Sequence, residues 1–178
     1  MGSEKKSELR ELLESILIAG VLAFFVITFV VQSFVVEGPS MEPSFYHGER
    51  LFVNKFIYRF REPERGDIII FEPRGAPSSK FIKRVIGLPG ETIELRGGEV
   101  YVDGALLEED YIQDPPRRSY GPYEVDQEEV FVLGDNRSNS SDSRFPHVGM
   151  VKYDSIDGKA FWVYWPLTEI RWVNTPSY

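Results

Sequence analysis

An uncharged stretch near the N-terminus, SILIAGVLAFFVITFVVQSFVV at residues 15–36, constrains the fold of this chain more than any other feature. A helix of about 20 apolar residues can cross a bilayer, and this stretch is apolar on every side until Gln32. A buried core helix would usually carry polar positions along one face. We therefore predict that residues 15–36 form a transmembrane helix that anchors the chain in a lipid bilayer.

The charges around this stretch predict its orientation. Three basic residues precede it, namely Lys5, Lys6 and Arg10. The next basic residue follows only at Arg50. Because loops rich in lysine and arginine stay in the cytoplasm, we predict a cytoplasmic tail over residues 1–14. The extracytoplasmic domain would then cover residues 37–178, on the outer face of the cell membrane.

A cleavable secretory signal is the alternative interpretation of the apolar stretch. The letters VQS at residues 31–33 place small or branched side chains at a suitable spacing for cleavage. The apolar run is longer than the usual core of a signal peptide, however, and it continues through Val36. The sequence therefore favours an uncleaved anchor.

Composition excludes several function classes. The chain contains no cysteine, so neither a disulfide framework nor a thiolate metal site is available. Its formal net charge is -8, which argues against a phosphate-binding surface and therefore against nucleic acid as a partner. A chain of 178 residues has room for one domain, with a small second lobe, besides the anchor.

After residue 40 the chain is predicted to be mainly β. Short segments rich in Ile, Val, Phe and Tyr alternate with Gly, Pro or Asp turns, at residues 50–60, 67–71, 81–88, 92–104, 129–135 and 159–165. We expect an antiparallel sheet with accessory hairpins over about residues 91–130, where LRGGEVYVDGALL is typical of a hairpin and a further tight turn. The run DPPRRSYGPY at residues 114–123 is predicted to be a loop.

Ser40 is the first candidate for chemistry. It lies in GPSMEPS, where Pro39 and Pro43 prevent a continuing helix. A serine in such a segment is most often only a turn residue. Ser40, however, lies within a few residues of the predicted membrane surface, where a nucleophile would meet substrates that are themselves in the membrane. A serine nucleophile needs a base.

Three residues are candidates for that base. His47 and His147 lie in FYHGE and FPHVG, which match no signature of a Ser-His-Asp site. Lys83 lies in FIKRVIGL, where strand alternation places it on one face with Phe81 and Val85. Burial there requires an ion pair or a neutral amine. A free lysine has a pKa of about 10.4, and a value about two pH units lower, suited to a base near pH 8, costs roughly 3 kcal/mol.

A loop with many polar side chains, GDNRSNSSDSR at residues 134–144, follows one of the predicted strands. Its charged and hydroxyl side chains include Asp135, Arg137, Ser138, Ser140, Ser141, Asp142 and Arg144. By itself the loop is consistent with a solvated turn that holds local ion pairs. Considered with Ser40 and Lys83, it is predicted to orient a serine–lysine dyad.

Five segments together resemble the conserved boxes of type I signal peptidases, the membrane-anchored serine endopeptidases that remove secretory signal peptides. The segments are GPSMEPS, RGDIIIF, KRVIGLPGE, GDNRSNSSDSR and GKAFWVYWP, in the order and approximate spacing of that family. Each box alone is weakly informative, whereas the ordered set is highly specific. The resemblance runs from the apolar stretch to about Pro166.

The resemblance implies a role for each matching residue. Ser40 matches the nucleophile, Lys83 the general base, and Ser140 the hydroxyl that hydrogen-bonds and orients the lysine amine. The loop that supports the dyad is matched by Asp135, Arg137, Asp142 and Arg144, and Arg144 is expected to pair with an aspartate. The family binds its substrate as an extended strand, with shallow pockets for small residues such as Ala; the positions expected to line them are Phe34, Val36, Met41 and Ile82.

The expected partners are the signal peptides of exported preproteins and the lipid bilayer, with no cofactor or metal and with a monomer as the working unit. Gly38 departs from the family, because many members have a serine there that helps to stabilise the oxyanion. The N–H of Ser40 is then the expected main donor. Two alternatives stay open: an anchored but inactive β domain that binds or scaffolds an envelope complex, and a peptidase with few dedicated substrates.

Overall fold

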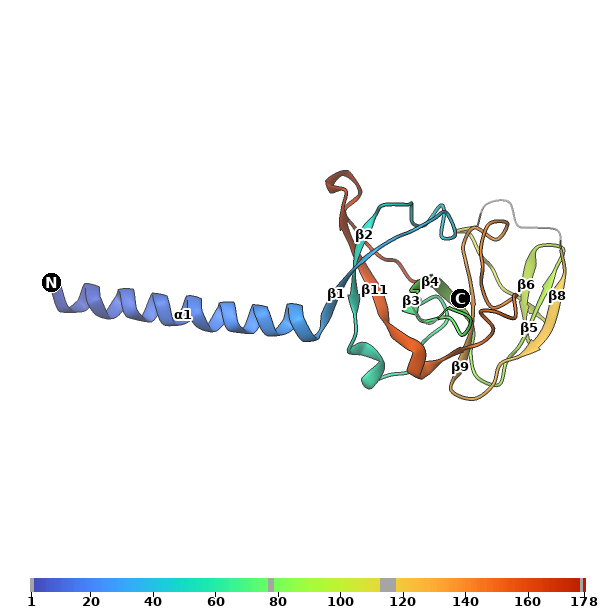
Figure 1. Cartoon of the computed structure of the whole chain (residues 1–178), viewed down its shortest axis with the longest axis horizontal. Helices are drawn as coiled ribbons and strands as arrows, with labels where there is room; N and C mark the ends of the chain where they lie inside the picture. Colours follow the sequence, from blue (N-terminus) through green and yellow to red (C-terminus); the bar gives the residue numbers. More distant parts are fainter. Residues whose placement is uncertain (1, 77–78, 113–117, 177) are drawn as a thin grey trace.

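The N-terminal helix projects away from a β-rich body. A computed structural model describes residues 2–76, 79–112, 118–176 and residue 178. Helix α1 (Gly2–Phe29) extends from the body as a single rod, and the strands gather at its far end (Figure 1). Within those described ranges, no helix combines the length and the hydropathy that crossing a bilayer requires.

The apolar stretch of residues 15–36 does not continue as one helix. Helix α1 ends at Phe29, and strand β1 (Val31–Val35) follows at once. Strand β1 pairs antiparallel with strand β2 (Arg50–Asn54), with Val31 opposite Asn54 and Val35 opposite Arg50. The predicted helix is therefore wrong over residues 31–35, because this part of the run finds a strand partner about 20 residues later.

The main sheet is antiparallel throughout, as the sequence predicts. Its strand order is β1-β2-β11-β3-β4-β9-β10, and β12 pairs with β11. Besides β1 and β2, its members are β3 (Ile68–Phe71), β4 (Phe81–Gly87), β9 (Glu129–Leu133), β10 (Val151–Lys152), β11 (Ile156–Trp165) and β12 (Arg171–Trp172). Three short 3-10 helices connect strands: η1 (Ile57–Arg59), η2 (Tyr153–Ser155) and η3 (Leu167–Glu169).

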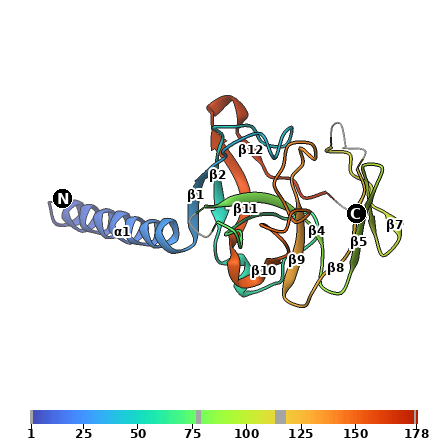
Figure 2. The ribbon, with the colours of Figure 1, turned by 45° about the vertical axis from the view of Figure 1, so that its right-hand side comes forward.

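A second, smaller sheet lies at the end of the body that is remote from α1 (Figures 1 and 2). Its order is β7-β6-β5-β8, with β5 (Thr92–Arg96), β6 (Glu99–Val102), β7 (Ala105–Leu106) and β8 (Tyr120–Glu124). We call it the accessory sheet. All of its strands come from the region for which accessory hairpins are expected.

Two sequence predictions differ from these strands. Residues 120–123 were expected in a loop but belong to strand β8. Because β8 is an edge strand with a neighbour on one side only, Pro122 is tolerated there without loss of a hydrogen bond to a second neighbour. Residues 114–117 of the predicted loop lie outside the described part. The strand expected over residues 50–60 ends at Asn54. Its side-chain Oδ1 accepts hydrogen bonds from the N–H groups of Phe56 and Ile57, which turns the chain into η1.

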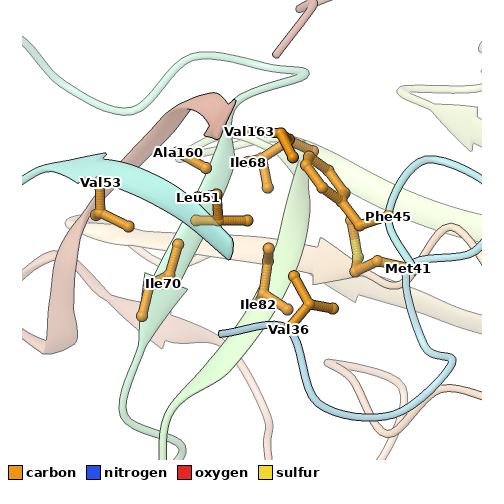
Figure 3. Close-up of a cluster of buried hydrophobic side chains, with 10 residues drawn as sticks. All are labelled: Val36, Met41, Phe45, Leu51, Val53, Ile68, Ile70, Ile82, Ala160 and Val163. Atoms are coloured by element: carbon orange, nitrogen blue, oxygen red, sulfur yellow. The ribbon is translucent and has the colours of Figure 1, made fainter. Parts of the chain in front are cut away.

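The main core packs the segment between β1 and β2 against the main sheet (Figure 3). Side chains from β2, β3, β4 and β11 meet those of the segment between β1 and β2: Val36, Met41, Phe45, Leu51, Val53, Ile68, Ile70, Ile82, Ala160 and Val163. Ile82 points into this cluster, whereas Phe81 and Val85 pack in a second cluster with Ile69. Alternation along β4 thus separates two cores, and it leaves Lys83 on the face of Phe81 and Val85.

Candidate active site

The turn that carries Ser40 is fixed by its buried neighbours. Met41 is fully buried and Val36 is 1% exposed, so both ends of the short connection are held in the main core. The N–H of Val36 donates to the carbonyl oxygen of Glu49, and the N–H of Asn136 donates to the carbonyl oxygen of Ser40 at 3.1 Å. Ser40 is therefore held from the core on one side and from the loop of residues 134–144 on the other.

Lys83 and Ser40 are in direct contact. Lys83 Nζ lies 2.7 Å from Ser40 Oγ and 2.7 Å from the carbonyl oxygen of Ile82, and the Lys83 residue is only 3% exposed. The amine also lies 5.4 Å from the centre of the Phe81 ring. Because no salt bridge to Lys83 occurs within the described residues, the amine lacks the counter-ion that would keep a buried ammonium stable.

Burial lowers the pKa of Lys83 from 10.5 to about 8. The carboxylates of Asp142 and Asp135 act in the opposite direction, since a nearby negative charge favours the ammonium form, but the loss of hydration is the larger effect. Near pH 8 about half of the molecules would therefore carry a neutral amine beside the serine hydroxyl.

Arg84, the next residue on β4, points away from Lys83 and is fully paired. Its Nε and Nη2 donate to Asp135 Oδ1 and Oδ2 at 2.9 and 2.6 Å, and the pair is buried with 3% and 0% exposure of the two side chains. Such a bidentate arginine–carboxylate contact has well-defined geometry. It ties β4 to the start of the 134–144 loop on the face opposite to Lys83.

The same loop contains a second buried ion pair. Arg144 donates from Nε and Nη2 to the Asp142 carboxylate at 2.7 and 2.8 Å, so the expected pairing of Arg144 with an aspartate is confirmed. Asp142 Oδ2 also accepts a hydrogen bond from the N–H of Gly134 at 3.1 Å. Arg137 instead donates from Nε to the carbonyl oxygen of Gly134 at 3.1 Å. These contacts close the loop on itself behind Ser40.

Ser140 does not make the hydrogen bond that the sequence predicts. Its Oγ is buried and has no hydrogen-bond partner among the described residues, so it does not bond to Lys83 Nζ. The hydroxyl packs against Gly134, where a Cβ atom would come within 2.2 Å of it. A buried hydroxyl without a partner is costly and is often found at functional sites.

Neither histidine is hydrogen-bonded to Ser40 within the described part of the chain. His47 Nδ1 accepts a hydrogen bond from the N–H of Gly38 at 3.1 Å, and His147 Nε2 is hydrogen-bonded to Ser141 Oγ. A base for Ser40 must lie within hydrogen-bond reach of its hydroxyl. Of the three candidates from the sequence, Lys83 meets this requirement.

A cavity of about 590 Å³ opens beside Ser40 and Lys83. Ser40, Lys83, Phe34 and Ile82 line it, together with Ser33, Val35, Glu37, Ser79, Lys80, Phe81 and Ser141. Two of the expected pocket residues, Val36 and Met41, do not line it, because both point down into the main core (Figure 3). Both side chains are buried in that core and do not reach the surface of the cavity.

Comparison with known proteins decides the family. The sequence profile of "Signal peptidase, peptidase S26" matches residues 9–165. The chain is 43% identical over 177 residues to a signal peptidase I of Leptolyngbya laminosa, covering 96% of this chain and 86% of the relative. It is 41% identical over 165 residues to a probable signal peptidase I-2 of Synechocystis, covering 90% and 75%.

The chain belongs to the signal peptidase family, peptidase S26. It is thus a hydrolase of the signal peptidase I type. A crystal structure of a signal peptidase I from Enterococcus faecalis V583 is also similar, with 34% identity, 56% of this chain and 97% of that one covered, and a TM-score of 0.47. Among the described residues, no group of three or more His, Asp or Glu side chains is arranged to hold a metal ion.

Sequence reasoning missed two residues of this signal peptidase site. Arg84 was not among the predicted site residues, although strand alternation places it on the face of β4 opposite to Lys83. Glu109 was not singled out at all, yet its carboxylate receives both Nη groups of the buried Arg137, at 2.9 and 2.6 Å. A buried arginine signals that some acidic partner exists. The sequence does not say which of the many carboxylates it is.

Proposed function

We propose that this signal peptidase cuts exported preproteins after the small residue that ends an Ala-x-Ala type site, with Ser40 as the nucleophile and Lys83 as the general base. The observation that carries the proposal is the 2.7 Å contact between Lys83 Nζ and Ser40 Oγ. The lowered pKa of Lys83, about 8, supports it, because a base must be neutral to accept a proton.

Acylation begins when neutral Lys83 takes the proton of the Ser40 hydroxyl. The Ser40 oxygen attacks the carbonyl carbon of the scissile peptide bond and forms a tetrahedral intermediate. The carbon–nitrogen bond then breaks, and Lys83 gives its proton to the leaving amine, which is the new N-terminus of the mature protein. The signal peptide is left as an ester on Ser40, and Lys83 is neutral again.

Deacylation repeats the proton transfers with water. Lys83 takes a proton from a water molecule, whose oxygen attacks the ester carbonyl carbon. When the bond to Ser40 breaks, Lys83 returns the proton to the serine oxygen, and the signal peptide leaves with a carboxylic acid that gives its proton to the solvent. In both steps the N–H of Ser40 is proposed as the main donor to the negative oxygen.

The loop of residues 134–144 is proposed to hold the dyad in place. Ser140 is proposed to receive a hydrogen bond from the Lys83 amine during turnover. The remaining support residues of the proposal are Asp135, Arg137, Asp142 and Arg144, whose side chains are buried and ion-paired. Fixed side chains around a dyad favour catalysis because they need no reorganisation as charge develops.

The substrate is proposed to lie as an extended strand along the cavity beside Ser40 and Lys83. Side chains of a strand alternate in direction, so those one and three positions before the scissile bond face the enzyme. Phe34 and Ile82, which line the cavity, are proposed to limit these positions to small residues.

The location at the cell membrane, with the N-terminus in the cytoplasm and a monomer as the working unit, stays a prediction. Its support is the uncharged sequence of residues 15–36 and the large exposed apolar side chains of α1. Alkaline extraction of membranes that contain the full chain tests the membrane location: retention in the membrane pellet supports it, and release into the wash contradicts it.

The test of the proposed reaction is the pH dependence of preprotein cleavage in detergent. We expect kcat/KM to rise with pH through an apparent pKa near 8, because only the neutral amine acts as a base. Lys83→Met and Ser40→Ala should both lose activity. Appreciable turnover by Lys83→Met would assign the base elsewhere, with His47 and His147 as the next candidates.

A further inference from the structure

A buried ion pair connects the accessory region to the loop behind the dyad. Arg137 has a side chain that is 0% exposed, and Glu109, which follows β7 of the accessory sheet, is 6% exposed. Glu109 Oε2 and Oε1 accept hydrogen bonds from Arg137 Nη1 and Nη2 at 2.9 and 2.6 Å. Since an unpaired guanidinium in this place would be very unfavourable, Glu109 determines where the Arg137 head group lies.

Arg137 in turn fixes the backbone of Gly134, which packs against Ser40. Its Nε donates to the carbonyl oxygen of Gly134 at 3.1 Å, and its own carbonyl oxygen accepts a hydrogen bond from Arg144 Nη2 at 2.9 Å. Gly134 is packed so closely that an added Cβ would lie 2.4 Å from the carbonyl oxygen of Ser40 and 2.2 Å from Ser140 Oγ. A displacement of Arg137 is therefore passed to both serines by direct contact.

The segment around Glu109 makes a second contact with the support of the site. The Tyr111 hydroxyl donates to Glu109 Oε1, and the Tyr111 ring lies against the Arg84 guanidinium, with 3.9 Å between the guanidinium carbon and the ring centre. Arg84 is the partner of Asp135. One short segment thus contacts both arginines, and these hold Gly134 and Asp135 at the start of the loop.

We propose that Glu109 is a positioning residue for the peptidase reaction and acts through Arg137 and Gly134 on Ser40 and Ser140. The segment that follows β7 of the accessory sheet, which does not line the cavity, thereby helps to set the geometry of the dyad. The inference rests on the proposed roles of Ser40 and Lys83. Because Glu109 does not line the cavity in which the substrate is proposed to lie, its effect belongs to the chemical step and not to the binding of substrate.

The experiment compares kcat and KM for preprotein cleavage by the full chain in detergent. The variants are Glu109→Gln, Arg137→Gln and their combination, with the exposed neighbour Glu108→Gln as a matched control. Circular dichroism at the assay temperature measures the folded fraction, and kcat is expressed per folded molecule. Ser40→Ala is assayed in parallel, so that a failure of the proposed nucleophile is recognised separately.

For Glu109→Gln we expect kcat to fall about tenfold, a change of about 1.4 kcal/mol in the barrier, with KM within about twofold of the parent. The double variant should be no slower than the slower single variant, because both changes break one connection. Glu108→Gln should match the parent. An unchanged kcat per folded molecule in Glu109→Gln, or losses that multiply in the double variant, would overturn the inference even when Ser40→Ala is inactive.

Discussion

Gly134 lies so close to the carbonyl oxygen of Ser40 that no residue larger than glycine fits at position 134. A Cβ atom on Gly134 would lie 2.4 Å from the carbonyl oxygen of Ser40, far inside normal contact. The Ser40 oxygen is a backbone atom and cannot move aside without displacing the serine itself, and Ser140 Oγ would lie only 2.2 Å from the same Cβ. Position 134 at the start of GDNRSNSSDSR therefore requires glycine for a steric reason that the sequence alone does not reveal.

Gly134→Ala should damage activity through this contact. A displacement of about 1 Å at a catalytic group costs about 100-fold in rate, and we expect kcat for preprotein cleavage to fall by about that factor. Gly20→Ala is the matched control, since Gly20 lies in α1 with nothing within 4 Å of an added Cβ. Equal kcat values for the two variants would mean that Ser40 is not held by Gly134.

The surroundings of Lys83 were predictable from local pattern. Strand alternation places Lys83 on the face of Phe81 and Val85, and the structure confirms this surrounding. The antiparallel sheet was predictable for the same reason, since its strands are short segments rich in Ile, Val, Phe and Tyr with turns between them. Such features depend on residues that are near one another in the sequence.

What could not be predicted depends on partners far apart in the chain. The pair of Glu109 and Arg137 joins residues 28 positions apart, and the sequence offers many other carboxylates. The end of α1 was misjudged because a run of β-branched and aromatic residues suits a helix in lipid and a strand equally well. Only the pairing of β1 with β2 decides between the two.

Lys83→Met should stabilise the fold at pH 7 while it abolishes activity. Burial lowers the pKa of Lys83 from 10.5 to about 8, so below pH 8 the folded chain must hold a buried ammonium that the unfolded chain keeps hydrated. This cost is fully present below the folded pKa and disappears as the pH rises toward the unfolded value. We expect a gain of about 1–3 kcal/mol in unfolding free energy at pH 7, after the loss of the amine's two hydrogen bonds.

Denaturant unfolding at pH 7 and at pH 10 measures this effect. The advantage of Lys83→Met over the parent should shrink at pH 10, where the parent amine is neutral in the folded state and only partly charged in the unfolded one. Lys55→Met, at an exposed position, is the control and should change stability equally at both pH values. The same gain at both pH values for Lys83→Met would contradict the lowered pKa.

Ser140→Ala should separate stability from activity. The Ser140 hydroxyl is buried without a hydrogen-bond partner among the described residues, so its removal relieves a desolvation cost and should not lower the melting temperature. If Ser140 Oγ accepts a hydrogen bond from the Lys83 ammonium during turnover, kcat of Ser140→Ala should fall about tenfold, because one hydrogen bond to a charged group is lost. A variant with a lower melting temperature and parental kcat per folded molecule would give Ser140 a structural role only.

Asp135→Asn should be among the most destabilising single changes in the chain. It leaves the guanidinium of Arg84, 3% exposed, without its charged partner, and breaking a buried pair from one side costs about 3–5 kcal/mol. The surface pair of Glu94 and Arg96 is the matched control, because Glu94→Gln breaks an ion pair in the accessory sheet that is open to water. Thermal unfolding should show a large decrease in melting temperature for Asp135→Asn and none for Glu94→Gln.

Asp135→Asn also removes a carboxylate that raises the pKa of Lys83, so the rise of kcat/KM with pH in the folded variant should shift to lower pH. If that rise moved to higher pH, Asp135 would not be acting on Lys83 through its charge.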